Sequence, residues 1–85
     1  MKQFSYVITD ELGIHARPAG LMVKAASVYK SSVTVAKGDK SADAKRIFGI
    51  MGLGVKQHDE ITVTIEGEDE NEAAQGLEEF IKNNL

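Results

Sequence analysis

The chain has 85 residues, of which ten are Lys or Arg and thirteen are Asp or Glu, and its formal net charge at pH 7 is -3. This length supports one hydrophobic core but not two, so a single domain spanning residues 1–85 is expected. The sequence contains no cysteine, which excludes disulfides and thiolate zinc sites. No apolar run approaches the roughly 18 residues that cross a bilayer, and no signal-peptide core is present. We therefore expect a cytoplasmic protein without membrane insertion.

The charges are unevenly distributed along the chain. Acidic residues crowd the last third, whereas the basic residues gather in the middle, at Arg17, Lys24, Lys30, Lys37, Lys40, Lys45, Arg46 and Lys56. Scattered lysines, a negative net charge and few aromatic residues for base stacking argue against nucleic-acid binding. A basic face that meets an acidic protein partner is the favoured interpretation.

The first elements follow from a change in hydrophobic period. Residues 2–8 alternate Phe4, Tyr6 and Ile8 on one face, which predicts a half-buried strand. Residues 9–15 read as a loop. A helix is predicted to begin near residue 15 or 16, because Pro18 is tolerated in a first helical turn. Its buried stripe consists of Ala19, Met22, Val23 and Ala26.

The remaining elements are two short strands, a short helix, a strand and a long helix. Strands are predicted over residues 31–37 and 40–44, joined by a tight turn at residues 38–39. Glycines break the apolar run 46–55 and favour a short helix followed by a loop. Residues 60–67 alternate most clearly and predict the central strand. Residues 69–84 predict a helix, and Asp69 with Glu72 resembles a capping box.

This order of elements predicts an α/β (α+β) fold of two layers. Strands with one buried face and helices with one apolar stripe pack as a single sheet with all helices on the same side. The opposite face of the sheet is expected to meet water.

His15 stands at the predicted start of the first helix, where unpaired N–H groups form an anion site. The field of the helix favours the neutral, nucleophilic imidazole. A phosphoryl group on His15 would lie beside the amides of Ala16 and Arg17 and near the Arg17 guanidinium. Because no Walker loop, acidic metal cluster or second base accompanies it, this pattern is typical of a carrier rather than a catalyst. A capping or surface histidine is the alternative on local pattern alone.

Several apolar residues lack an obvious place in the core. Leu21 lies off the stripe of the first helix, and one short helix cannot bury Ile47, Phe48, Ile50 and Met51 on a single face. Either a partner docks there or a small core uses all of them, and the spacing leaves both open. Phe48 and Met51 are the best candidates for exposure. His58 reads as a turn residue without chemistry.

Three segments, "GIHARPAGL", "IFGIMGLGV" and "ITVTIEGEDENEA", resemble HPr, the histidine-containing phosphocarrier family of the bacterial phosphoenolpyruvate-dependent sugar phosphotransferase system. The resemblance extends over the whole chain. It implies an open-faced β-sandwich of four antiparallel strands with three helices on one face. It also implies a monomer that needs neither cofactor nor metal and is not itself an enzyme.

The resemblance further assigns roles to individual residues. His15 would accept phosphate on Nδ1 from phosphorylated enzyme I and pass it to sugar-specific enzyme IIA proteins. Arg17 and the amides of Ala16 and Arg17 would stabilise the phosphate. The partner-docking surface would comprise Gly20, Leu21, Lys24, Ile47, Phe48 and Met51.

Arg46 departs from a pattern common in the family. Many members carry a regulatory serine immediately before the short helix, where an ATP-dependent kinase phosphorylates it, but this chain has "KRIFGIMGLG". Arg46 is not a substrate for a serine kinase, and it cannot cap the helix as serine does, a loss of about 1 kcal/mol. The kinase branch and the repressor binding that depends on phosphoserine are therefore predicted to be absent.

Two other functions remain open from the residues. The same fold and histidine would serve a nitrogen-related phosphotransferase chain or a phosphoenolpyruvate-linked dihydroxyacetone kinase. A small acyl-phosphate hydrolase or a ligand-binding α/β sandwich would use the same anion site, although water-positioning side chains around Arg17 are missing.

Overall fold

The structure is a computed structural model and describes all residues, 1–85. Four strands and three helices follow one another in the predicted order. Their bounds are β1 Lys2–Val7, α1 Ala16–Ser27, β2 Ser32–Lys37, β3 Lys40–Asp43, α2 Ile47–Gly52, β4 Glu60–Glu66 and α3 Glu70–Asn84.

The four strands form one antiparallel sheet in the order β1-β4-β2-β3. Val63 of β4 faces Phe4 of β1 on one side and Val35 of β2 on the other. The alternating segment that begins at Glu60 is thus a central strand, as predicted. Strands β2 and β3 form a hairpin closed by the two residues Gly38 and Asp39.

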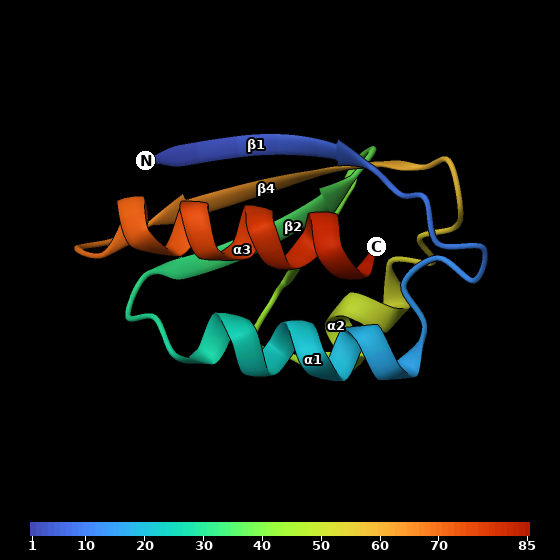
Figure 1. Ribbon diagram of the computed structural model, residues 1–85, viewed down its shortest axis with the longest axis horizontal. Helices are drawn as coiled ribbons and strands as arrows, with labels where there is room; N and C mark the ends of the chain where they lie inside the picture. Colours follow the sequence, from blue (N-terminus) through green and yellow to red (C-terminus); the bar gives the residue numbers. More distant parts are fainter.

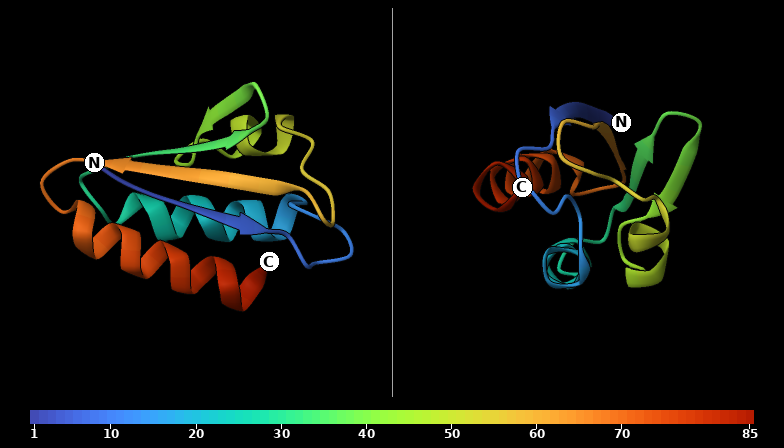
Figure 2. Two further views of the ribbon diagram at one scale, coloured as in Figure 1. Left: turned by 90° about the horizontal axis from the view of Figure 1, so that it is seen from above. Right: turned by 90° about the vertical axis from the view of Figure 1, so that its right-hand side faces the viewer.

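All three helices cover the same face of the sheet (Figures 1 and 2). The other face is polar, and its side chains bond across the strands: Ser5 Oγ lies 3.1 Å from Thr62 Oγ1, and Gln3 Nε2 donates to Thr64 Oγ1 at 3.0 Å. This arrangement confirms the predicted open-faced sandwich.

The core lies between the sheet and the helices. Met22, Ala26, Leu77 and Ile81 of the helices are buried together with Ile61, Val63 and Ile65 of β4. Burial of these apolar side chains is the main force that holds the two layers together. The stripe of α1 differs in one respect from the prediction, because Val23 is only half-buried whereas Pro18 is buried. No helix here has the length and apolar character that crossing a membrane requires.

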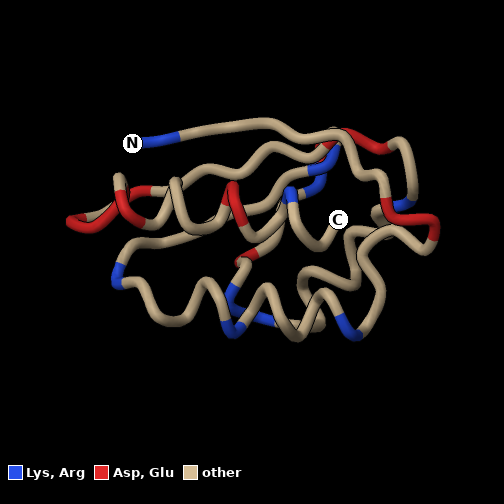
Figure 3. Tube along the Cα trace, viewed as in Figure 1, with Lys and Arg blue, Asp and Glu red and all other residues tan.

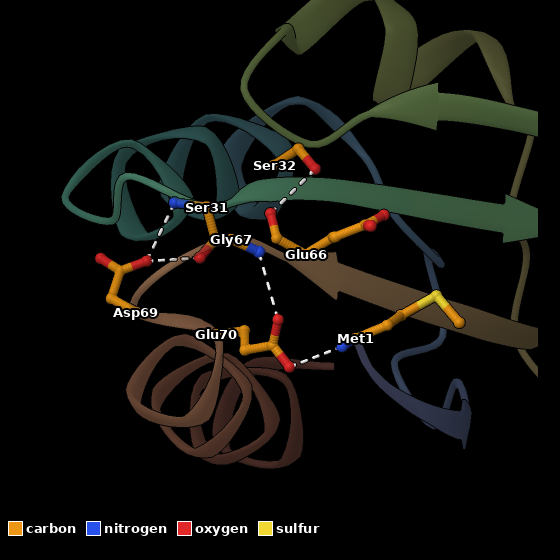
Figure 4. A network of polar contacts seen from close by, with 7 residues as sticks. All are labelled: Met1, Ser31, Ser32, Glu66, Gly67, Asp69 and Glu70. Atoms are coloured by element: carbon orange, nitrogen blue, oxygen red, sulfur yellow. Dashed lines mark hydrogen bonds and ion pairs between the residues drawn. The ribbon is translucent and has the colours of Figure 1, made fainter.

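The capping box predicted for α3 is wrong. Asp69 is the N-cap residue, but its carboxylate makes no capping bond. It instead accepts a hydrogen bond from the Lys30 N–H at 2.8 Å. It also accepts one from the Ser31 N–H at 2.9 Å and one from the Ser31 hydroxyl, which Figure 4 shows. The bond from the Ser31 hydroxyl, followed by that from the Lys30 amide, holds the pKa of Asp69 below its ordinary value. A tertiary contact with the turn before β2 has outcompeted the local cap.

The neighbouring carboxylate of Glu70 closes the same corner of the molecule. It accepts a hydrogen bond from the α-ammonium group of Met1 at 2.6 Å and one from the Gly67 N–H at 3.3 Å (Figure 4). The ammonium contact first, and the Gly67 amide second, lower the pKa of Glu70. Asp69 and Glu70 together join the start of α3 to β1 and to the turn before β2.

Candidate functional site

His15 is the N-cap residue of α1, with extended backbone angles of φ -97° and ψ -174°. Its carbonyl oxygen accepts the first helical hydrogen bond, from the Ala19 N–H at 2.9 Å, but its side chain makes no capping bond. The N–H groups of Ala16 and Arg17 donate to no acceptor within the protein. Two free donors therefore lie next to an imidazole that is not engaged in capping, as an anion site requires.

The His15 side chain, 37% exposed, lines a shallow depression of about 240 Å³. Arg17, Pro18 and Leu21 of α1 line it as well, and so do Asp10 and Asn84. Arg17 is exposed and forms no ion pair, so its guanidinium is free to meet an anion in the depression. The structure therefore brings His15 and Arg17, the two residues predicted to carry the chemistry, into one solvent-accessible depression.

The loop before His15 is held by a close approach of two backbones. Gly13 has a φ of +66°, and a Cβ atom there would strike the carbonyl oxygen of Val55 and lie 2.7 Å from the Cα of Lys56. The Ile14 N–H donates to the same Val55 oxygen at 3.2 Å. Only glycine meets both the positive φ and the lack of space. The loop that delivers His15 is thus fixed against the segment before β4.

Sequence reasoning missed two residues of the depression, Asp10 and Asn84. The Leu85 carbonyl oxygen accepts from the N–H groups of Thr9 and Asp10, at 2.6 and 2.9 Å, and thereby brings the end of α3 beside the loop. Nothing local in the sequence indicates this long-range contact. For Asp10 a signal existed, because aspartate two residues before an N–H donor in a turn is a common Asx-turn pattern.

An apolar patch on the adjoining helices α1 and α2 consists of Leu21, Phe48 and Met51, and its member Leu21 also lines the depression. Phe48 is 84% exposed, Leu21 41% and Met51 38%. Exposure of Phe48 and Met51 is confirmed. Ile50 is buried in the core, and Ile47 is half-buried against it. Gly20 lies beside Ile47, since a Cβ on Gly20 would be 3.7 Å from Ile47 Cδ1.

The two long helices differ in the charge of their side chains. Helix α1 carries Arg17 and Lys24 with no acidic residue, whereas α3 carries Glu70, Glu72, Glu78 and Glu79 with Lys82 (Figure 3). Lys24 is exposed. The two long helices therefore present surfaces of opposite charge, as the uneven distribution along the chain predicts.

Arg46 occupies the N-cap position of α2, and its exposed side chain makes no capping bond. Asp43 organises the turn in front of it: its carboxylate accepts from the Lys45 N–H at 2.9 Å, and its carbonyl oxygen accepts from the Arg46 N–H at 3.0 Å. The start of α2 thus lacks a side-chain cap, in agreement with the expectation for arginine.

The fold and the site define a small open-faced α/β sandwich that presents a histidine at a helix N-terminus. Solved structures share this architecture. HPr from Thermoanaerobacter tengcongensis is 42% identical, with a TM-score of 0.92 over 98% of this chain and 93% of that one. Crh, the catabolite repression HPr of Bacillus subtilis, was solved as a dimer with a swapped domain. It is 35% identical, with a TM-score of 0.79 over 100% of this chain and 98% of that one.

The chain belongs to the HPr family of the phosphotransferase system, because the model described as "PTS HPr component phosphorylation site" matches residues 2–83. The phosphocarrier protein HPr of Lysinibacillus sphaericus is 43% identical over 77 residues, which are 91% of this chain and 88% of the relative. The family resemblance read from the three sequence segments is confirmed.

Proposed function

We propose that this chain is a cytoplasmic phosphoryl carrier of sugar uptake, which accepts a phosphoryl group from phosphorylated enzyme I on His15 and donates it to enzyme IIA proteins. The observation that carries the proposal is the partly exposed imidazole of His15 beside the two free N–H groups of Ala16 and Arg17, in a chain of the HPr family. These donors and the Arg17 guanidinium favour a phosphate dianion on the ring.

Phosphoryl transfer requires little more of this chain than an accessible His15 imidazole. Transfer between two imidazoles is an in-line displacement in which the nucleophile must be accessible and the charge of the moving group must be stabilised. The partner supplies the opposite half of the site. A carrier of this kind has to bind each partner briefly, which agrees with a shallow, open depression.

The apolar patch and the cations around it support the same proposal. Leu21, Phe48 and Met51 offer exposed apolar surface on α1 and α2, the helices that also carry Gly20 and Ile47, and Leu21 lines the depression. Lys24 and Arg17 lie on the acid-free helix α1. We propose that both partners dock here through an acidic face with an apolar centre, because exposed apolar clusters mark contact sites and complementary charge steers encounter.

Arg46 bears on how the carrier is regulated. The family's regulatory serine position is filled by a side chain that has no hydroxyl to phosphorylate. We propose that carrier activity here is independent of an ATP-dependent serine kinase.

The decisive experiment is intact mass spectrometry after incubation with phosphoenolpyruvate, magnesium and purified enzyme I. One acid-labile phosphate is expected on the wild type and none on His15→Ala. An Arg17→Ala variant should still be labelled, but more slowly. A wild-type chain that stays unlabelled by an enzyme I active on another HPr would contradict the proposal and direct attention to a different phosphotransferase chain.

A further inference from the structure

Asp10 is the charged residue of the depression for which the carrier mechanism described above has no role. Its Oδ1 atom lies 4.0 Å from Nε2 of His15. The same Oδ1 accepts the Leu12 N–H at 2.8 Å, and the Asp10 carbonyl oxygen accepts the Gly13 N–H at 3.0 Å. A third hydrogen bond joins the Asp10 N–H to the Leu85 carbonyl oxygen. The carboxylate is therefore held in place before any partner arrives.

A fixed carboxylate beside one ring nitrogen distinguishes the two nitrogens of a neutral imidazole. One nitrogen of the neutral ring carries the proton and the other carries the lone pair. A negative charge favours the proton on the nearer nitrogen, as carboxylates do for the far nitrogen of metal-bound or catalytic histidines. Here the nearer nitrogen is Nε2, so the lone pair is left on Nδ1.

We propose that Asp10 is a positioning residue that keeps the proton of His15 on Nε2 and thereby makes Nδ1 the nucleophile. This inference rests on the proposed function and deepens it. The only other charged side chain that lines the depression is Arg17, a cation, which would repel rather than hold a ring N–H.

The transfer step balances under this assignment. The Nδ1 lone pair of neutral His15 forms the N–P bond while the N–P bond of the donor's protonated phosphohistidine breaks, and the donor imidazole leaves neutral. No proton moves, because His15 keeps its Nε2–H and becomes a phosphorylated imidazolium. The carboxylate of Asp10 then faces an N–H group on a ring that has gained positive charge, which stabilises the phosphorylated carrier.

The chain contains a matched control for this role. Glu11 follows Asp10 directly, is exposed, and forms no hydrogen bond or ion pair with its side chain. Asp10→Asn and Glu11→Gln remove the same charge. Asp10→Asn also keeps an Oδ1 acceptor for the Leu12 N–H, so the turn is retained. Asp10→Ser is a second variant with a short oxygen acceptor and no charge.

The test is ¹⁵N NMR of the His15 ring at alkaline pH, where the shifts of the two nitrogens report which one carries the proton. In Asp10→Asn and Asp10→Ser the ratio of the Nε2–H to the Nδ1–H form is expected to fall about twofold to fivefold, the range for one ionic contact at a partly exposed site. Glu11→Gln should match the wild type. The initial rate of phosphate uptake from enzyme I should fall with the ratio.

An unchanged ratio in both Asp10 variants would overturn the inference, and so would an equal fall in Glu11→Gln. The NMR measurement needs no partner protein. A wild type that enzyme I fails to label, together with a ratio that falls in the Asp10 variants, would reject the carrier function while leaving the effect of Asp10 on the ring intact.

Discussion

Single residues in this protein act mainly by holding backbone segments that are distant in the sequence. Asp69 is the clearest case, because its carboxylate accepts two amides and a hydroxyl from the turn before β2. A carboxylate that accepts such bonds is stabilised in its charged form. At the start of α3 this ionised side chain therefore makes tertiary contacts in place of a local cap.

The lowered pKa of Asp69 predicts how stability changes in acid. A group whose pKa is lowered on folding contributes stability that is present above its ordinary pKa of 3.8 and is lost as the pH falls through the folded value. Asp69→Asn should thus unfold more easily than the wild type at neutral pH and show a smaller loss between neutral pH and acid. Urea unfolding at both pH values measures this. Asp39→Asn, in the exposed hairpin turn, is the control and should follow the wild type.

Gly13 predicts a second effect at the scale of a residue, and Gly54 provides its control. Both have positive φ, but a Cβ on Gly54 meets no atom within 4 Å, whereas one on Gly13 meets the backbone of Val55 and Lys56. Gly54→Ala should cost about 1 kcal/mol of unfolding free energy for its backbone conformation. Gly13→Ala should cost about 3 kcal/mol, because overpacking adds to the same penalty. Equal losses in denaturant titrations would argue against the close approach.

At the scale of the element, the six residues of α2 contribute one side chain to the core and expose another to solvent. Ile50 is fully buried, and Phe48, two positions earlier, is 84% exposed. A helix this short has little stability of its own, so its attachment through Ile50 keeps Phe48 in place. The two side chains should therefore separate stability from partner binding.

Phe48→Ala should change the unfolding free energy by less than about 0.5 kcal/mol and raise KM for the carrier in the enzyme I reaction about tenfold. Ile50→Ala should lose about 2–5 kcal/mol of unfolding free energy, because it leaves a cavity in the core. Thermal unfolding and steady-state phosphotransfer assays measure the two effects. A Phe48→Ala carrier with an unchanged KM would remove this residue from the docking surface.

Arg46 at the uncapped start of α2 leads to two predictions, one on stability and one on phosphorylation. Arg46→Ser should stabilise the protein by about 1 kcal/mol, since serine can accept the free N–H groups of the first turn. With ATP and a cognate HPr serine kinase, the wild type should acquire no phosphate in intact mass spectra. Kinase-dependent phosphate on the wild type, at any residue, would contradict the proposed independence from this regulation.

Local patterns predicted the elements well because β4 and the long helices each bury one face. Alternation located β4 in the centre, and Pro18 located the start of α1. The capping box failed because Asp69 found better partners 38 residues away in Ser31. The position of Asn84 was not predicted either, because only the packing of α3 brings this residue to the depression that holds His15. Sequence periodicity describes which face is buried but not which segments meet.

The sheet has two edge strands, β1 and β3, and neither is well suited to pair with a strand of a second copy of the chain. Strand β3 has only four residues and begins with Lys40, and β1 begins with Lys2. Short edge strands and charged residues discourage edge-to-edge pairing. We therefore predict a monomer of 9.2 kDa by size-exclusion chromatography with light scattering. A mass twice as large that persists on dilution would reject this prediction.

Because β1 pairs only with β4, the order of synthesis affects how the chain folds on the ribosome. Strand β1 leaves the ribosome first, yet its only partner is synthesised after α1, β2, β3 and α2. The β2–β3 hairpin can form early, but β1 must wait with its edge groups unsatisfied until β4 emerges. Nascent chains stalled before Glu60 should therefore be the form in which this protein most needs a chaperone.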